Sequence, residues 1–193
     1  MNTNKKYIKM GGLALVVIIV FGWTMSSYNG FVGKDEQCKS QWSKVQVQYQ
    51  RRMDLIPNLV STVKGYATHE SSTLEKVIAA RNKALNTPSN EASSAQYEKA
   101  QSTLTSAIRD INVVVERYPE LKANENFLAL QSQLEGTENR IAVERKRYAE
   151  LVQEYNRSVR VFPKSIIASI FSFNQKEYYQ AEASAEQSPK VAF

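Results

Sequence analysis

Apolar residues recur at alternating spacings of three and four from Tyr28 onward, which is typical of helices packed against partner helices. The last long segment carries one row of apolar positions seven residues apart and two residues on a companion row: Phe127, Leu134, Ile141, Tyr148, Tyr155 and Phe162, with Leu130 and Leu151. A strict seven-residue repeat predicts left-handed supercoiling against a partner. Gly136 interrupts this segment, so we expect either a close helix approach or a slight bend there.

A middle segment repeats the pattern on two rows: Tyr97, Leu104, Ile111 and Tyr118, with Ala100, Ala107 and Val114. Pro119 should end this helix, because proline removes a helical hydrogen bond and clashes with the preceding turn. A further helix is then predicted to start near Asn124.

The first segment carries two rows that Asp35 and Arg52 interrupt: Tyr28, Trp42, Tyr49, Ile56 and Val63, with Phe31, Cys38, Val45, Leu59 and Tyr66. We expect Cys38 to be a small core residue and Pro57 to kink the helix. A break is predicted between Gly65 and Ser72, and the pattern leaves open whether the chain reverses or only bends there. Ser72 and Glu75 have the spacing of a capping box, and the helix that follows should stop at residues 87–90.

These segments predict an all-α fold. It consists of an N-terminal transmembrane helix followed by a long antiparallel helical bundle with coiled-coil-like packing. Seven glycines and five prolines in 193 residues agree with long helices. We divide the chain into a basic head (1–9), a transmembrane anchor (10–27), the bundle (28–163) and a tail (164–193). The tail begins with apolar residues suited to packing back on the bundle or touching the membrane, and it ends polar.

Residues 10–25 contain no charged side chain and are apolar throughout, long enough with their flanks to span a bilayer as a helix. Trp23 and Tyr28 would lie at the interface. A cleaved signal peptide is the alternative, but Thr24-Met25-Ser26 fits a cleavage site poorly. The three lysines of the head favour a cytoplasmic N-terminus and a bundle on the extracytoplasmic side, and the short head leaves the opposite orientation open. We therefore expect a single-pass protein of the bacterial inner membrane.

The charge distribution argues against nucleic-acid binding. The net charge is +6, but Lys5, Lys6 and Lys9 supply half of it, and the remainder mixes 22 basic with 19 acidic residues. Such alternation is typical of a solvated helix surface.

No pattern of catalytic, metal-binding or cofactor-binding residues is complete. Cys38 and His69 are the only residues of their types, so an internal disulfide and a Cys/His zinc site are excluded. His69-Glu70 resembles the start of a helical zinc motif, but position 73 holds Thr73 in place of a second histidine. No nucleophile-elbow or phosphate-binding glycine motif occurs. We predict no enzyme activity, no cofactor and no metal.

Two polar clusters lie within apolar surroundings. The first contains Arg51, Arg52, Asp54 and Asn58 around Pro57, where the side chains could satisfy backbone groups that the proline frees; a binding surface is the alternative. The second contains Glu138, Asn139 and Arg140, which follow Thr137. It could be a buried hydrogen-bonded layer that fixes helix register or a partner-recognition site. Lys64, His69 and Glu70 complete the candidate polar positions.

The run Arg51-Arg-Met-Asp-Leu-Ile-Pro-Asn-Leu-Val60 closely resembles the signature of the LemA family of bacterial membrane proteins. Further segments that resemble this family are Val63-Lys-Gly-Tyr-Ala67, His69-Glu70, Glu116-Arg-Tyr-Pro-Glu-Leu-Lys-Ala-Asn124, Thr137-Glu-Asn-Arg-Ile-Ala142, Tyr155-Asn156 and Phe162-Pro163. The resemblance covers nearly all of residues 28–193. It implies a helical bundle tethered to the cell membrane, and it implies no known enzymatic activity or ligand.

The leading hypothesis is a non-catalytic membrane scaffold or adaptor that organises partner membrane or envelope proteins, with lipid contacting residues 10–27. The alternative from another class is a ligand-binding or sensory bundle coupled to a separate membrane partner. A third hypothesis is self-assembly into a homo-oligomer, in which apolar rows of separate chains meet.

Overall fold

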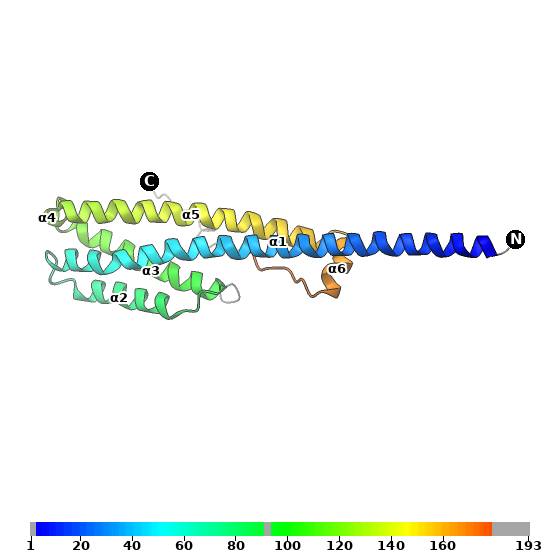
Figure 1. Cartoon of the computed structure of the whole chain (residues 1–193). Coiled ribbons are helices and arrows are strands. Elements are labelled where there is room, and N and C mark those ends of the chain that lie inside the picture. The colour runs from blue at the N-terminus through cyan, green and yellow to red at the C-terminus, as the bar shows by residue number, and fades with distance from the viewer. Residues whose placement is uncertain (1–2, 91–93, 179–193) are drawn as a thin grey trace, which may run out of the picture. The chain divides into compact units, whose positions relative to one another are not determined.

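The computed structural model describes residues 3–90 and 94–178 (Figure 1). Its elements are α1 (Thr3–Lys64), α2 (Ser71–Asn86), α3 (Ser94–Glu116), α4 (Pro119–Lys122), α5 (Glu125–Arg160) and α6 (Lys164–Ile170). The described residues contain helices and no strands, which confirms the all-α prediction. They form two compact units, one from the residues up to Ser40 with Ala149–Tyr178 and one from Gln41–Tyr148. The polar end of the predicted tail, residues 179–193, lies outside the described part.

In the second unit, α2 runs antiparallel to α1, so the chain reverses direction between the two helices. The Arg81 guanidinium on α2 donates through Nε to the Met53 carbonyl on α1 (2.8 Å). Beyond the end of α2, the Ser89 carbonyl accepts from Nε1 of Trp42 (2.7 Å), earlier on α1. This pairing answers the question that the sequence pattern left open at residues 65–72.

The helices α3 and α5 complete an up-down-up-down bundle in this unit (Figure 1). Trp42 lies against Tyr97 of α3, and further along α1 the Arg52 side chain reaches Thr105, so α1 and α3 run in the same direction. Trp42 also lies against Tyr148 of α5, whereas Arg52 contacts the earlier Glu138, so α5 runs the opposite way. The short α4 connects α3 to α5.

The core of the second unit consists largely of the predicted seven-residue rows. Its fully buried side chains include Val45, Ile56, Val63, Leu104, Ile111 and Ile141. Burying a large apolar side chain stabilises the fold by about 1.5–3 kcal/mol. These rows are therefore the main source of the bundle's stability.

Three local predictions need correction. Phe162 is 76% exposed, because α5 ends at Arg160 and the seven-residue row stops with it. A methyl group added at Gly136 would meet nothing within 4 Å, so the close helix approach, one of the two alternatives expected there, does not occur. The capping box is not formed: α2 begins after Glu70 and has no side-chain cap hydrogen bond. The kink expected at Pro57 stays a prediction: the helix α1 contains Pro57 and continues beyond it to Lys64.

The first unit joins the start of α1 to the end of α5 and to α6. Cys38 is fully buried in this unit, which confirms its prediction as a core residue. Lys34 pairs with Glu154 (3.1 Å), and Asp35 pairs with Lys176 (2.7 Å). The two ion pairs connect α1 with both α5 and the segment that follows α6.

Candidate functional site

Arg52 lies at the centre of a polar layer inside the second unit, and its side chain is 1% exposed. Its position on α1, between Tyr49 and Ile56, points it into the bundle core, where an unpaired guanidinium would cost several kcal/mol. The guanidinium carbon lies 5.2 Å from the centre of the Tyr49 ring, within the range of a cation–π contact. The Tyr49 ring, on the same helix as Arg52, therefore stabilises the guanidinium charge.

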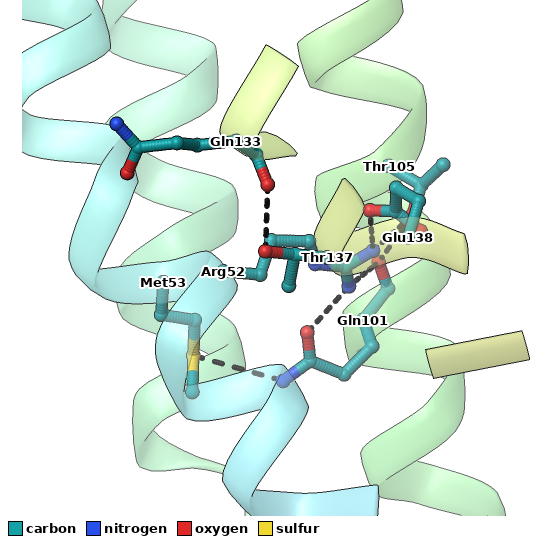
Figure 2. Close-up of polar contacts among 7 residues, drawn as sticks. All are labelled: Arg52, Met53, Gln101, Thr105, Gln133, Thr137 and Glu138. Carbon is teal, nitrogen blue, oxygen red and sulfur yellow. Dashed lines mark hydrogen bonds and ion pairs between the residues drawn. The ribbon is translucent and has the colours of Figure 1, made fainter. Parts of the chain in front are cut away.

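The other two long helices of the layer supply the acceptors for Arg52, as Figure 2 shows. Nη1 donates to the Thr105 hydroxyl (2.7 Å) and to the Glu138 carboxylate (2.6 Å). Nη2 donates to the backbone carbonyl (3.0 Å) and the side-chain oxygen (2.6 Å) of Gln101. Four of the five guanidinium N–H groups are thus used, and among the described residues Nε has no acceptor. A fork of this kind fixes both the rotation and the register of α1 against α3 and α5.

The neighbours of Arg52 are themselves held in place. The Gln101 amide nitrogen contacts the Met53 sulfur (3.6 Å), and Thr105 donates to the Gln101 carbonyl (3.1 Å). On α5, buried Thr137 donates to the Gln133 carbonyl (2.7 Å). The Glu138 side chain is 40% exposed, so the layer reaches solvent on that side only through a carboxylate. The polar groups of the layer thus bind mainly one another, and the Glu138 carboxylate is partly exposed to solvent.

The structure brings together one member of each predicted polar cluster, Arg52 and Glu138, and places the other candidates elsewhere. Five of the remaining candidates in the first cluster and the 64–70 segment are exposed: Arg51, Asp54, Asn58, Lys64 and His69. Asp54 accepts from Gln50 one turn earlier (2.8 Å), and Glu70 pairs with Arg117 (3.1 Å). Asn139 and Arg140 are exposed on α5. Each predicted cluster therefore divides into one member of the polar layer, buried Arg52 or partly exposed Glu138, and a set of surface residues.

Gln101 and Thr105 are members of the layer that the sequence reading missed. A signal for Gln101 was present, since it lies between Tyr97 and Leu104 at helical spacing and therefore at a core position of α3. A polar residue at such a position needs a partner, because an unsatisfied buried amide costs about 1–3 kcal/mol. Thr105 gave no comparable signal, because it follows the core position Leu104 directly.

A largely buried carboxyl group lies at Glu98 on α3: its side chain is 14% exposed, and its Oε1 lies 3.9 Å from Nε of Arg145 on α5. Burial raises the pKa of the Glu98 carboxyl to about 7, although the nearby Arg145 charge lowers it in part. Burial also raises the pKa of the Tyr49 phenol well above its usual range. Glu98 is therefore a group that exchanges its proton near neutral pH.

The chemistry available to the Arg52 layer is hydrogen bonding. The guanidinium and the Gln101 amide are neither nucleophiles nor proton acceptors, and the one carboxylate, Glu138, is engaged by Arg52. Within residues 3–90 and 94–178, no three His, Cys, Asp or Glu side chains are grouped so that they could hold a metal ion.

In the described chain, α1 is the one helix long and apolar enough to cross a membrane. Its apolar side chains from Met10 onward point outward, among them Leu13 (67% exposed), Ile18 (70%) and Phe21 (64%). Transfer of each of these side chains from water into an apolar environment such as a bilayer would be favourable by about 1.5–3 kcal/mol. The segment therefore indicates association with a membrane.

Comparison with known proteins gives a consistent set of relatives. The model of the LemA family matches residues 41–193. Magnetosome protein MamQ 2 of Paramagnetospirillum magneticum is 23% identical over 194 residues, which cover 89% of this chain and 71% of the relative. Protein LemA of Metamycoplasma hominis is 24% identical over 188 residues, which cover 93% of this chain and 84% of the relative. The matched region includes every residue of the Arg52 layer.

Proposed function

This chain belongs to the LemA family, and on that premise we propose that it is a non-catalytic scaffold or adaptor held in the bacterial inner membrane by residues 10–27. The observation that carries the proposal is the continuity of α1 from Thr3 to Lys64. The same helix bears the exposed apolar segment and, further along, the core residues Ile56 and Val63. The membrane segment and these core residues therefore belong to one helix.

The closed polar layer supports a scaffolding role over a catalytic one. Arg52 directs its charge to groups of the same chain, and its partners Glu138 and Thr105 are only partly exposed. An active site needs reactive groups that a substrate can reach in a defined geometry. Here the strongest polar groups serve the packing of the bundle.

The surface proposed for partner contact is the outward stripe of α1 in the second unit. It contains Val47, which is 62% exposed, and the exposed Arg51, Asp54 and Asn58. Their spacings of four, three and four residues place them along one face of the helix. One apolar and three polar side chains on one rigid face suit recognition of a partner protein.

Site-specific photocrosslinking of the full-length protein in native membranes tests this proposal. A photoreactive residue at position 51 or 58 should capture a defined partner protein, whereas one at the exposed Arg109 of α3 should not. Equal capture at all three positions, or no capture at any of them, would remove the proposed stripe. Capture of the chain by itself at position 51 or 58 would favour the homo-oligomer instead.

We also propose that the bundle lies on the extracytoplasmic side, because of the three lysines before the apolar segment. A Cys38→Ala, Ser106→Cys variant gives one exposed thiol on α3. A membrane-impermeant maleimide added to spheroplasts should label it. If labelling requires membrane lysis, the bundle faces the cytoplasm.

A further inference from the structure

The segment from Val161 to Phe171 carries apolar side chains on its exposed surface as well as on its buried one. Ile167 and Ala168 of α6 are buried against the protein, at 4% and 2% exposure. The outward side chains are also apolar and remain uncovered among the described residues: Val161 (49% exposed), Phe162 (76%), Ile166 (53%), Ile170 (69%) and Phe171 (47%). A short helix with two apolar faces needs a second apolar environment.

Aromatic contacts place this segment next to the end of the membrane span. The Tyr28 ring lies 5.0 Å from the Phe171 ring and 5.4 Å from the Phe173 ring, measured between centroids. The Phe31 and Phe173 rings are 5.2 Å apart. Tyr28 directly follows the proposed span, residues 10–27. The exposed side chains of α6 therefore lie close to the level at which α1 leaves the bilayer.

Several polar contacts hold the segment in this position. Buried Asn156 of α5 donates to the Lys176 carbonyl and accepts from the Lys176 amide, both at 2.8 Å. The Lys176 ammonium pairs with Asp35 of α1 (2.7 Å). At the end of α6, Phe173 N–H donates to the Ala168 carbonyl (2.9 Å) while Ser172 takes a positive φ of 59°, the geometry of a Schellman cap. The chain is thus fixed to α5 and α1 directly after the segment.

The charged residues in this segment and in the last turn of α5 before it are all basic. No acidic residue occurs between Glu154 and Glu177. Arg157, Arg160 and Lys164 are exposed, and in the part of the chain that the structure describes none of them makes an ion pair. Exposed cations beside apolar side chains are typical of elements that lie in the headgroup region of anionic bilayers.

We propose that residues 161–171 form an interfacial membrane contact, with their outward apolar side chains inserted among the lipid headgroups of the bilayer that residues 10–27 span. The inference rests on the proposed membrane span. The occupant is lipid, because the ring contacts with Tyr28 bring these side chains to the membrane surface and the neighbouring cations match anionic headgroups. The contact gives the first unit a second attachment besides α1.

Depth-dependent fluorescence quenching of the full-length protein tests the proposal. Single cysteines are placed in a Cys38→Ala background and labelled with a polarity-sensitive dye, and the protein is reconstituted in phosphatidylcholine–phosphatidylglycerol vesicles. A dye at Ile170→Cys should lose most of its emission to a doxyl quencher near the headgroups. A dye at the exposed Glu150→Cys of α5, in the same unit, should keep its emission.

A third labelled position separates the two proposals. A dye at Leu15→Cys, within the span, should be quenched by a doxyl group deep in the acyl chains. If Leu15 is quenched while Ile170 behaves like Glu150, the span stands and the interfacial contact is wrong. If Leu15 is not quenched, the membrane span itself is wrong. If the Ile170 dye is shielded from water without lipid quenching, a second chain covers the segment and the lipid contact is equally excluded.

Discussion

Arg52 and Glu138 lie 2.6 Å apart although 86 residues separate them along the chain. Their contact joins α1 to α5 across the bundle core, while Gln101 and Thr105 fill the remaining side of the guanidinium from α3. One charged side chain of α1 thus contacts two further helices, α3 and α5. Its loss should affect the register of the whole bundle.

Replacing Arg52 by methionine should lower the free energy of unfolding by about 2–4 kcal/mol, because buried acceptors on Gln101 and Thr105 would lose their donor. Glu138→Gln should cost less, since its side chain is 40% exposed and the amide oxygen still accepts. The double variant should lose about 1–3 kcal/mol less than the sum of the two losses. Chemical denaturation of the full-length protein in detergent measures all three.

Arg51→Met is the matched control for this cycle, because Arg51 is the exposed neighbour of Arg52. It should change the free energy of unfolding by less than about 0.5 kcal/mol. Equal losses for Arg51→Met and Arg52→Met, or strict additivity in the double variant, would contradict the assigned role of the layer.

Gly136→Ala should stabilise the protein by about 1 kcal/mol, because alanine has the higher helix propensity and a methyl group at this position would meet nothing within 4 Å. Ala142→Gly, at an exposed position of the same helix, should cost a similar amount. Thermal unfolding followed by circular dichroism compares the two. A lower melting temperature for Gly136→Ala would mean that a neighbouring group restricts this face of α5.

Stability should fall as the pH rises from about 4.5 to 7, because the folded protein binds the Glu98 proton more tightly than the unfolded chain does. The contribution is complete below the unfolded pKa of 4.5 and is lost as the pH passes the folded pKa of about 7. It amounts to at most about 3 kcal/mol. Glu98→Gln should flatten this part of the pH profile of the melting temperature.

Glu116→Gln, which removes an exposed carboxylate from the same helix, should leave the slope of the profile unchanged. If Glu98→Gln and Glu116→Gln give the same profile as the unsubstituted protein, burial does not raise the pKa of Glu98.

Asn156→Ala should loosen the segment after α6, because the Lys176 amide and carbonyl would lose their buried partner. The local cost is about 1–3 kcal/mol. Hydrogen exchange should accelerate in amides 165–176, while amides of the second unit keep their protection. Arg157→Ala, at the exposed neighbouring position, should leave the exchange rates unchanged. Unfolding of the whole protein by Asn156→Ala would show that this contact is not local.

The seven-residue rows predicted most of the core, because burial of one helix face leaves a periodic record in the sequence. Tyr97, Leu104 and Ile111 are buried as expected. The rows could not reveal which polar residues meet, since Arg52 and Glu138 come together only through the order and direction of the helices. Phe162 shows the limit of the pattern, because the row continued past the point where α5 ends.

The layout of the Arg52 layer has a consequence for synthesis of the protein. A ribosome that adds about 5–20 residues per second needs roughly 4–17 s to pass from Arg52 to Glu138. During that interval the core face of α1 lacks the last helix of the bundle, and its apolar side chains are available for wrong contacts. A chaperone that covers the nascent α1 would shorten the time this face spends unprotected.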